Sequence, residues 1–285
     1  MEFEYRNPTH ISDLFTMLEQ YGNSAAMLAG GTDLVNHMRI GKRSPHQILE
    51  LKNIKELSRE IKYDENGVTI GALATLADIE TDSMIRKLYP AIAESANKVG
   101  SKQIRNRATL VGNICNASPA ADTAPALLIY NAEVNIISRH GRRSMSVESF
   151  ITGPGKTALK QGELVESIYV PNPQNLSSSC YIKLARREGA DLTTVGVAVL
   201  LSEHGEVRVG LGAVAPVPFR AYSAERLLSN GLDDPISLEK GLEAAMHQAN
   251  PISDLRGSRE YRLAMIKALT RKALEICRKS LVLEV

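Results

Sequence analysis

Two segments rich in small and polar residues contain the groups best suited to bind a ligand. The first, Arg105 to Pro125, combines amides, hydroxyls and one carboxylate, Asp122, in a run with little helical or strand periodicity. A loop of this length inside a compact domain is usually functional, and its apolar flanks argue against disorder. We expect it to lie between a helical segment and an apolar helix, Pro125 to Tyr130, and to hold a ligand.

The second segment, Ala29 to Leu34, follows a short apolar run, Ala25 to Ala29, that predicts a strand. Gly30 and Gly31 then end the strand, and Thr32 or Asp33 can cap a helix that begins at Leu34. Such a turn exposes backbone N–H groups that suit a phosphate. A tight turn without a ligand explains the same pattern, because short glycine motifs occur by chance.

Both segments let a ligand approach the backbone closely, as the pyrophosphate of a dinucleotide requires. Neither fits G-x-G-x-x-G, so a Rossmann site is disfavoured, and the chain has no G-x-S-x-G, H-E-x-x-H or P-loop pattern. The cysteines Cys115, Cys180 and Cys277 form no C-x-x-C pair, and the six histidines do not cluster at ligand spacing. We therefore expect reduced, buried cysteines and no metal site on this chain.

The composition is that of an ordinary globular protein. The chain has 285 residues, 44% hydrophobic and 23% charged, and 34 basic against 32 acidic residues leave a net charge of +2. This balance, with no tryptophan, argues against nucleic-acid binding. Since the N-terminus is not a signal peptide and no apolar run is long enough to span a bilayer, we expect a cytoplasmic protein without a membrane segment.

Hydrophobic spacing predicts alternating helices and strands in the first part of the chain. We expect a helix over 9–21 capped by Thr9 or Ser12, a helix capped near Thr75, and an amphipathic helix over 82–99 interrupted by Pro90. The same patterns predict strands at 47–51, 68–70, 133–138 and 166–170 and a turn of helix at 53–57.

The second part begins after a break in composition at Pro171–Pro173 and Ser177–Ser179, where we place a domain boundary. Val195 to Leu201 predicts a buried strand, and His204-Gly205 predicts the turn of a hairpin before an alternating strand at 207–211. Helices are expected at 221–229, 238–249 and 260–280, and no catalytic cluster is visible in this part.

Several motifs occur together in order along nearly the whole chain. They are AGGTDL (29–34), IRNRATLVGN with ASPAADTAP (104–125), GELVESIYVP (162–171), KLARREGADL (183–192), PFRA (218–221) and SREYR (258–262). Together they resemble the FAD-binding medium subunit of molybdenum hydroxylases of the xanthine dehydrogenase and carbon monoxide dehydrogenase type.

The resemblance implies an α+β fold. An FAD-binding domain of the vanillyl-alcohol-oxidase (PCMH) type would cover 1–172, with lobes of about 1–55 and 56–172. A smaller domain with a three-stranded antiparallel sheet and helices would cover 173–285. It also implies that FAD is the cofactor of this chain, with [2Fe-2S] clusters on a small partner subunit and molybdopterin on a large one. Electrons would pass through FAD to NAD or another acceptor, within a dimer of heterotrimers.

The resemblance also implies positions for the FAD-binding residues. The pyrophosphate would lie along Met27 to Leu34, with main-chain donors from Gly30, Gly31 and Thr32. Lys183 would approach the isoalloxazine ring, where a cation would stabilise the reduced flavin, although a solvated strand lysine explains it equally. Asp122 would bind the flavin side, or alternatively cap the following helix. The complete set is Met27, Leu28, Ala29, Gly30, Gly31, Thr32, Asp33, Leu34, Thr109, Leu110, Val111, Gly112, Asn113, Ser118, Asp122, Val165 and Lys183, with no catalytic residue and no metal ligand.

One position departs from the family pattern. Val111 stands where the second loop usually has glycine, and a β-branched residue is unsuited to a positive φ. If that conformation is essential, FAD binds weakly, and the chain is a structural subunit that has lost the cofactor. A self-contained flavin oxidase would need its own base or covalent attachment residue, for which Cys115 is the one weak candidate. We favour the electron-transfer subunit, whose substrate lies on another chain.

Overall fold

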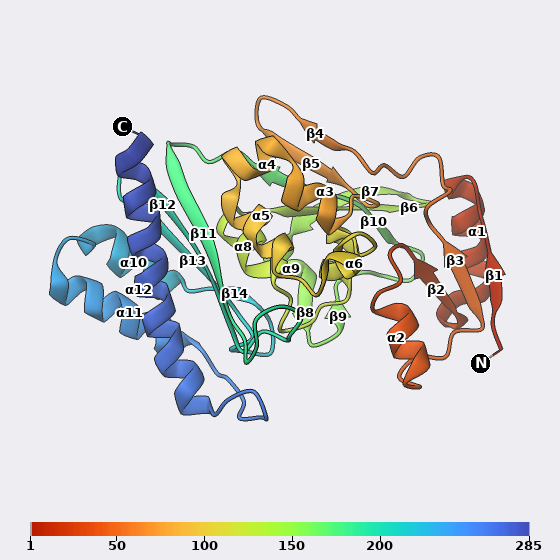
Figure 1. Cartoon of the computed structure of the whole chain (residues 1–285). Coiled ribbons are helices and arrows are strands. Elements are labelled where there is room, and N and C mark those ends of the chain that lie inside the picture. Colours follow the sequence, from red (N-terminus) through yellow and green to blue (C-terminus); the bar gives the residue numbers. More distant parts are fainter. Residues whose placement is uncertain (1, 285) are drawn as a thin grey trace.

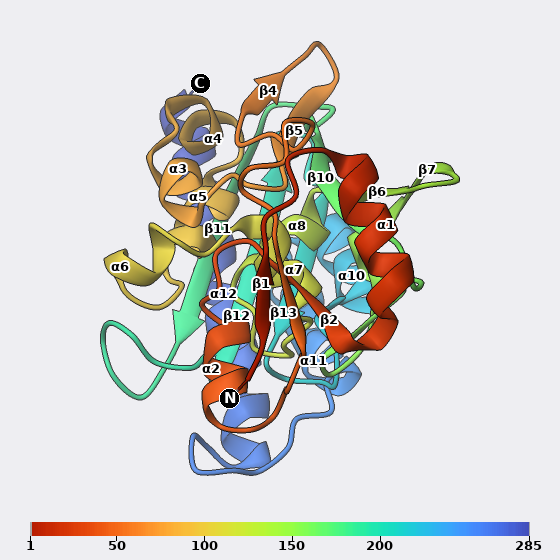
Figure 2. The ribbon, with the colours of Figure 1, turned by 90° about the vertical axis from the view of Figure 1, so that its right-hand side faces the viewer.

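The N-terminal lobe is a small parallel sheet with two helices, one before and one after the Gly30-Gly31 turn in the sequence. The computed structural model describes residues 2–284. Strands β1 (Glu4–Arg6), β3 (Gln47–Glu50) and β2 (Ala25–Leu28) pair in this order, with helices α1 (Ile11–Tyr21) and α2 (Leu34–Arg39) and a 3-10 turn at Gly22–Ser24. Figure 2 shows α1 and α2 flanking this sheet. The predicted strands at 25–29 and 47–51 are therefore confirmed, each one residue shorter.

Two local predictions in this lobe are wrong. Helix α1 begins at Ile11 after His10, which makes no side-chain cap, so neither Thr9 nor Ser12 is the N-cap. The Ile11 N–H instead donates to the Glu56 carboxylate at 3.2 Å, a partner that sequence spacing cannot reveal. Residues 53–57 form hydrogen-bonded turns, not a turn of helix, with Ile54 and Leu57 buried in the core.

The middle of the molecule is a five-stranded antiparallel sheet, β4-β5-β10-β6-β7. Its central strand, β10 (Leu164–Pro171), pairs with β5 (Gly67–Gly71) and β6 (Glu133–Ser138), and β4 (Ile61–Tyr63) and β7 (Gly141–Ser146) form the edges. A bulge interrupts β10 between Val165 and Ser167. Helix α9 (Val147–Phe150) and the short pair β8 (Ile151–Gly153) and β9 (Lys156–Thr157) follow β7.

Helices α3 (Leu76–Thr81), α4 (Ser83–Leu88), α5 (Pro90–Asn97) and α8 (Thr123–Ile129) share one hydrophobic core with this sheet. Thr75 caps α3 through a reciprocal capping box with Asp78, as predicted. The predicted helix over 82–99 is two helices, because Tyr89 leaves helical geometry and Pro90 begins α5 at the position where proline needs no N–H partner.

The C-terminal part is a sheet covered by helices on both faces. Strands β11 (Ser177–Leu184), β12 (Val195–Ser202), β13 (Val207–Gly212) and the two-residue β14 (Phe219–Arg220) are antiparallel, and helices α10 (Tyr222–Gly231), α11 (Pro235–Gln248) and α12 (Arg259–Glu284) follow. In β12, Val197 and Val199 face a second core with these helices, whereas Ala198 and Leu200 belong to the first core. Burial on both faces explains the unbroken apolar run of this strand.

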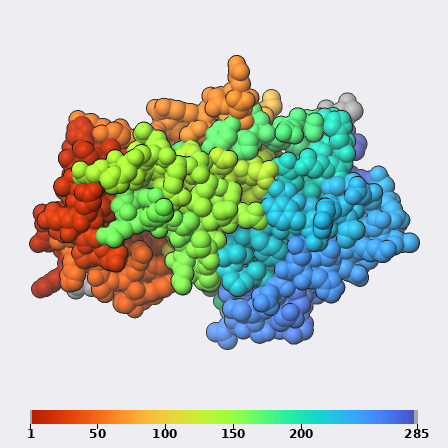
Figure 3. Space-filling model, turned by 180° about the vertical axis from the view of Figure 1, so that it is seen from behind, coloured from red at the N-terminus to blue at the C-terminus, as the bar shows by residue number. Residues whose placement is uncertain are grey.

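The three regions lie in a row, with the N-terminal lobe and the C-terminal helices at opposite ends (Figures 1 and 3). Residues Ser177–Ser179, which looked like a linker in the sequence, are the first residues of β11. The hairpin at His204-Gly205 is confirmed, with Gly205 at φ +83°. Among the described residues, no helix combines the length and apolar character that crossing a membrane requires.

Candidate functional site

The two small-residue segments meet at Gly30. A Cβ atom on Gly30 would overlap the Arg107 carbonyl oxygen and lie 2.7 Å from its carbonyl carbon and 3.0 Å from the Ala108 Cα. Only glycine allows the turn after β2 to lie this close to the backbone before Thr109. Gly31 has φ +76°, a conformation that also favours glycine. The Gly30-Gly31 pair therefore brings two segments together that are far apart in the sequence.

The turn after Gly30 leaves backbone donors available. Within residues 2–284, the N–H groups of Gly31, Thr32 and Asp33 donate no hydrogen bond. Helix α2 begins at Leu34 as predicted, but the Asp33 side chain makes no cap, and the Val35 N–H donates to the Gly31 carbonyl at 3.0 Å. Asp33 therefore occupies the N-cap position, one of the two predicted, but it makes no side-chain cap. Backbone amides without an acceptor in the protein suit an anionic group.

The segment Arg105–Pro125 contains a helix that was not predicted from the sequence. Helix α6 (Lys102–Arg105) ends at its first residue, and α7 (Leu110–Cys115) lies within the predicted loop, which corrects the loop assignment there. The Thr109 hydroxyl accepts the Gly112 N–H at 2.9 Å and caps α7. Leu110, Val111 and Ile114 then bury their side chains, which holds this short helix in place.

Val111 is accommodated without strain. It lies inside α7, is 7% exposed, and is not among the described non-glycine residues with positive φ. The concern that a β-branched residue would be forced into a glycine conformation therefore does not apply. Asn113 in the same helix accepts the Thr123 hydroxyl at 2.6 Å, and this bond joins α7 to the start of α8.

Asp122 and Lys183 form a buried ion pair where the first and second parts of the chain meet. The Lys183 Nζ lies 2.9 Å from Asp122 Oδ2, and their side chains are 6% and 7% exposed. Asp122 Oδ1 accepts hydrogen bonds from the Tyr181 hydroxyl at 2.7 Å and the Thr193 hydroxyl at 2.6 Å. The Lys183 ammonium also donates to the carbonyl of Lys98, the C-cap residue of α5, at 2.9 Å.

The groups around Asp122 shift the pKa of its carboxyl in opposite directions. Burial raises the pKa of the Asp122 carboxyl, while the Lys183 charge and the hydroxyl donors of Thr193 and Tyr181 lower it. Burial raises the pKa of the Tyr181 hydroxyl, and the charge and hydrogen bond of the Asp122 carboxylate raise it further. Lys183 is not a solvated strand lysine, and Asp122 makes no side-chain cap on α8, so both simpler explanations are wrong.

The remaining predicted residues lie around these two contacts. Ser118 stabilises its own loop, since its Oγ accepts the Ala120 N–H at 3.2 Å. Val165 is buried beside the bulge of β10, a strand against which α7 packs. Met27 and Leu28 are in β2, directly before the glycine turn. Tyr181 and Thr193 were missed, because a tyrosine in an alternating strand and a threonine in a loop carry no signal that identifies their partner.

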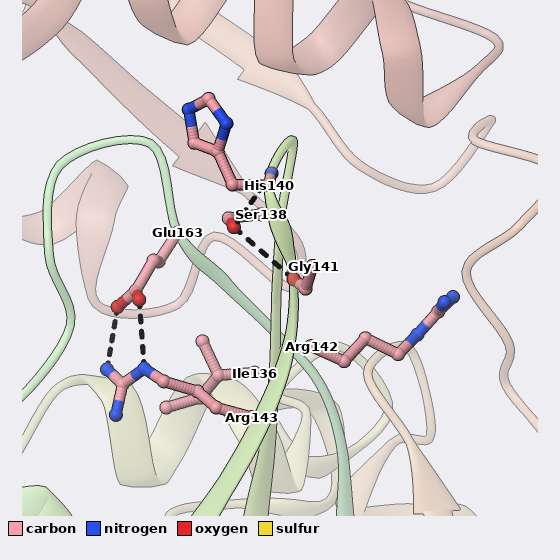
Figure 4. Close-up of a pocket in the computed structure, with 7 residues that line it drawn as sticks. All are labelled: Ile136, Ser138, His140, Gly141, Arg142, Arg143 and Glu163. Carbon is pink, nitrogen blue, oxygen red and sulfur yellow. Dashed lines mark hydrogen bonds and ion pairs between the residues drawn. The ribbon is translucent and has the colours of Figure 1, made fainter.

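A surface hollow of about 170 Å³ lies away from these residues, on the β6–β7 hairpin (Figure 4). Arg143 contacts Glu163 there through two hydrogen bonds of 2.9 and 2.7 Å, and Arg142 points away to pair with Glu166. Because both arginines already have carboxylate partners, the hollow offers no charge to a ligand. It is not the site indicated by the sequence.

The chain is an α+β protein in which the turn after β2 meets the segment before α7. Residues 1–173 match the family model described as the FAD binding domain in molybdopterin dehydrogenase, and residues 180–276 match the CO dehydrogenase flavoprotein C-terminal domain. The chain therefore belongs to the FAD-binding medium subunits of molybdenum hydroxylases of the xanthine dehydrogenase and carbon monoxide dehydrogenase type, which are oxidoreductases.

Individual relatives and structures agree with this membership. The chain is 31% identical over 275 residues to a xanthine dehydrogenase FAD-binding subunit of Escherichia coli O157:H7, covering 95% of this chain and 94% of the relative. It is 33% identical to a glyceraldehyde dehydrogenase medium chain of Sulfolobus acidocaldarius, covering 96% and 98%. A solved carbon monoxide dehydrogenase from Hydrogenophaga pseudoflava is similar with a TM-score of 0.93 at 29% identity, covering 98% of both chains.

Proposed function

We propose that this chain binds FAD where the segments 27–34 and 109–113 meet, and that it passes electrons from iron–sulfur clusters of a partner subunit through FAD to NAD or another acceptor. The observation that carries the proposal is the contact of Gly30 with the backbone of Arg107 and Ala108. It brings the glycine turn after β2 beside the segment that leads into α7, and we propose that the two phosphates of the dinucleotide bind there.

The residues at this contact fit the pyrophosphate part of FAD. The N–H groups of Gly31, Thr32 and Asp33 would donate to phosphate oxygens, and the bare backbone of Gly30 leaves no side chain in the way. The polar side chains of Thr109, Asn113 and Ser118 would line the ribityl part. When bound, FAD supplies a redox centre that none of the twenty side chains provides.

The buried ion pair would act on the isoalloxazine end. Asp122 holds Lys183 in one place, and the Lys98 carbonyl accepts a second hydrogen bond from its ammonium. An ammonium carries three donors, so one remains for a ligand. A fixed cation at this position would favour the negatively charged, reduced form of the cofactor, while Val165 would contact the edge of the ring.

We further propose the assembly around this chain. Two domains would divide near residue 172, with lobes of about 1–55 and 56–172, in agreement with family models that end at 173 and resume at 180. An iron–sulfur small subunit and a molybdopterin large subunit would complete a heterotrimer, and two heterotrimers would form a dimer in the cytoplasm. The names of the relatives as medium chains support the existence of other subunits.

The alternative, a structural subunit without FAD, rested on Val111. That residue has helical geometry in α7, so the alternative has lost its one supporting observation. We therefore favour the electron-transfer function.

The test is to purify the full chain with added FAD, desalt it, and record the flavin absorption. Retained flavin that NADH bleaches under anaerobic conditions would support both the site and NAD as acceptor, whereas retained flavin insensitive to NADH would indicate another acceptor. If neither the chain nor its complex with partner subunits retains flavin, the proposal is wrong.

A further inference from the structure

A buried arginine in α12 lies behind the loop that carries Asp122. Arg262 is 1% exposed and has the largest of the fully buried side chains. Its Nη1 donates to two carbonyl oxygens, that of Thr194 at 3.0 Å and that of Ala213 at 2.8 Å. Burying a guanidinium is costly, and packed apolar residues often give equal stability. The contacts of Arg262 therefore call for an explanation beyond packing.

Both carbonyls belong to segments that contact the loop Ser118–Asp122. The Ala213 N–H donates to the Pro119 carbonyl at 2.7 Å. Thr193, adjacent to Thr194, donates its hydroxyl to Asp122 Oδ1 at 2.6 Å. One guanidinium therefore fixes the end of β13 and the start of β12, and each of these strand ends bonds to a different point of the loop.

The backbone of Ala213 indicates that this arrangement is held in place. Ala213 has φ +63°, a conformation that costs energy for a residue with a side chain. Its carbonyl bonds to Arg262 and its N–H to Pro119, so the two bonds act on opposite sides of the strained residue. The strained residue therefore lies where the end of β13 contacts the loop Ser118–Asp122.

A second arginine acts on the neighbouring carbonyl. The Arg256 Nη1 donates to the Thr193 carbonyl at 3.2 Å, and its Nη2 lies 2.6 Å from Asp254 Oδ2. Asp254 Oδ1 accepts from Arg262 at 2.7 Å, so one carboxylate joins the two arginines. The Thr193 carbonyl is thus held from the loop before α12, and the Thr194 carbonyl from the first turn of that helix.

We propose that Thr193, Arg256 and Arg262 are positioning residues of the flavin site, which hold Asp122 so that the Lys183 ammonium keeps one orientation. The inference rests on the proposed FAD site. With two hydroxyl donors on Oδ1, the Asp122 carboxylate presents Oδ2 to Lys183. Without the Thr193 hydroxyl, Oδ1 keeps only the Tyr181 donor, and its less compensated charge draws the ammonium toward itself, away from a ligand.

The central variant is Thr193→Val, which removes the hydroxyl and keeps the side-chain shape, with Thr193→Ser as the variant that restores the donor. We expect Thr193→Val to bind oxidised FAD about tenfold more weakly, from the loss of one hydrogen bond to a charged group. We also expect a further loss of about tenfold for reduced FAD, which lowers the midpoint potential by about 30 mV for a two-electron couple. Thr193→Ser should match the wild type in both measurements.

The second variant, Arg256→Met, removes the donor to the Thr193 carbonyl without leaving Arg262 unpaired. Its matched control is Arg271→Met, which removes an arginine with a carboxylate partner, Glu239, from helix α12, the helix that follows Arg256. FAD titration, potentiometry and thermal unfolding are measured for every variant of the full chain. Arg256→Met should shift the potential in the same direction as Thr193→Val, and Arg271→Met should leave it unchanged.

The inference is overturned if Thr193→Val and Arg256→Met lower the melting temperature but leave FAD affinity and potential as in the wild type, because the cluster would then be structural. Lys183→Met separates this failure from that of the FAD site. If Lys183→Met alters FAD affinity while the other two do not, the site stands without its positioning residues. If none of the three alters it, the proposed site fails as well.

Discussion

Gly30→Ala is the substitution that most directly tests the contact between the two loops. The added Cβ would lie 2.7 Å from the Arg107 carbonyl carbon, whereas ordinary contact begins at 3.4 Å. The two segments must therefore separate by more than about 0.7 Å, because the Arg107 carbonyl oxygen would lie closer still, and these obstructing atoms are backbone, which no rotamer change can move. Overpacking of this kind costs about 1–3 kcal/mol, which corresponds to a drop in melting temperature of roughly 2–4 °C per kcal/mol for a chain of this size.

The same displacement should reduce cofactor binding, because the amides at 31–33 would no longer be aligned with the segment after Thr109. The assay is thermal unfolding together with FAD retention after desalting. The matched control is Gly153→Ala, whose Cβ would meet only the Lys156 side chain at 3.7 Å. If Gly30→Ala unfolds at the same temperature as Gly153→Ala and retains the same flavin, the close contact of the loops is refuted.

Two further variants test other parts of the reasoning. Val111→Gly should destabilise the chain by about 2–4 kcal/mol, because it removes a buried side chain and places a glycine within α7, and it should not improve FAD retention. Urea unfolding measures the stability, and flavin absorption measures the retained FAD. A gain in retained flavin would contradict the helical role of Val111. The hydrogen bonds and charges of Arg256, and the nearby Arg262, hold the pKa of Asp254 well below its ordinary value of 3.8. A carboxyl whose pKa is depressed in the folded protein stabilises it at pH values above the ordinary pKa, and this stability is lost as the pH falls below that value. The urea midpoint of the wild type should therefore fall more steeply below about pH 4 than that of Asp254→Asn, with Asp13→Asn at an exposed position as control. Equal slopes for the wild type and Asp254→Asn would disprove this coupling.

Local signals in the sequence predicted much of the fold. The short apolar run before Gly30-Gly31 is β2, the cap at Thr75 begins α3, and the His204-Gly205 turn joins β12 and β13. Each of these features depends on residues within a few positions of one another. The predicted loop failed at Leu110–Cys115 because a helix of this length owes its stability to tertiary burial, which periodicity over six residues cannot show.

The site was less accessible to sequence reasoning. The resemblance singled out Asp122 and Lys183, but nothing in the chain indicated that they bond to each other across 61 positions. The Thr193 hydroxyl meets the Asp122 carboxylate, and the Arg262 guanidinium meets backbone carbonyls, only after the chain has folded. The N-cap of α1 failed for the same reason, because its partner, Glu56, comes from a distant turn.

The pairing of β10 has a consequence for the order in which the chain folds during synthesis. Strand β5, residues 67–71, pairs with residues 167–171 of the central strand β10, whereas the strands of the N-terminal lobe all lie before residue 51. The lobe can therefore fold early on the ribosome. One edge of β5 stays unpaired until about one hundred further residues have been synthesised and β10 is available. During that interval the nascent chain exposes apolar strand surface, so this stretch is where a chaperone would be needed most.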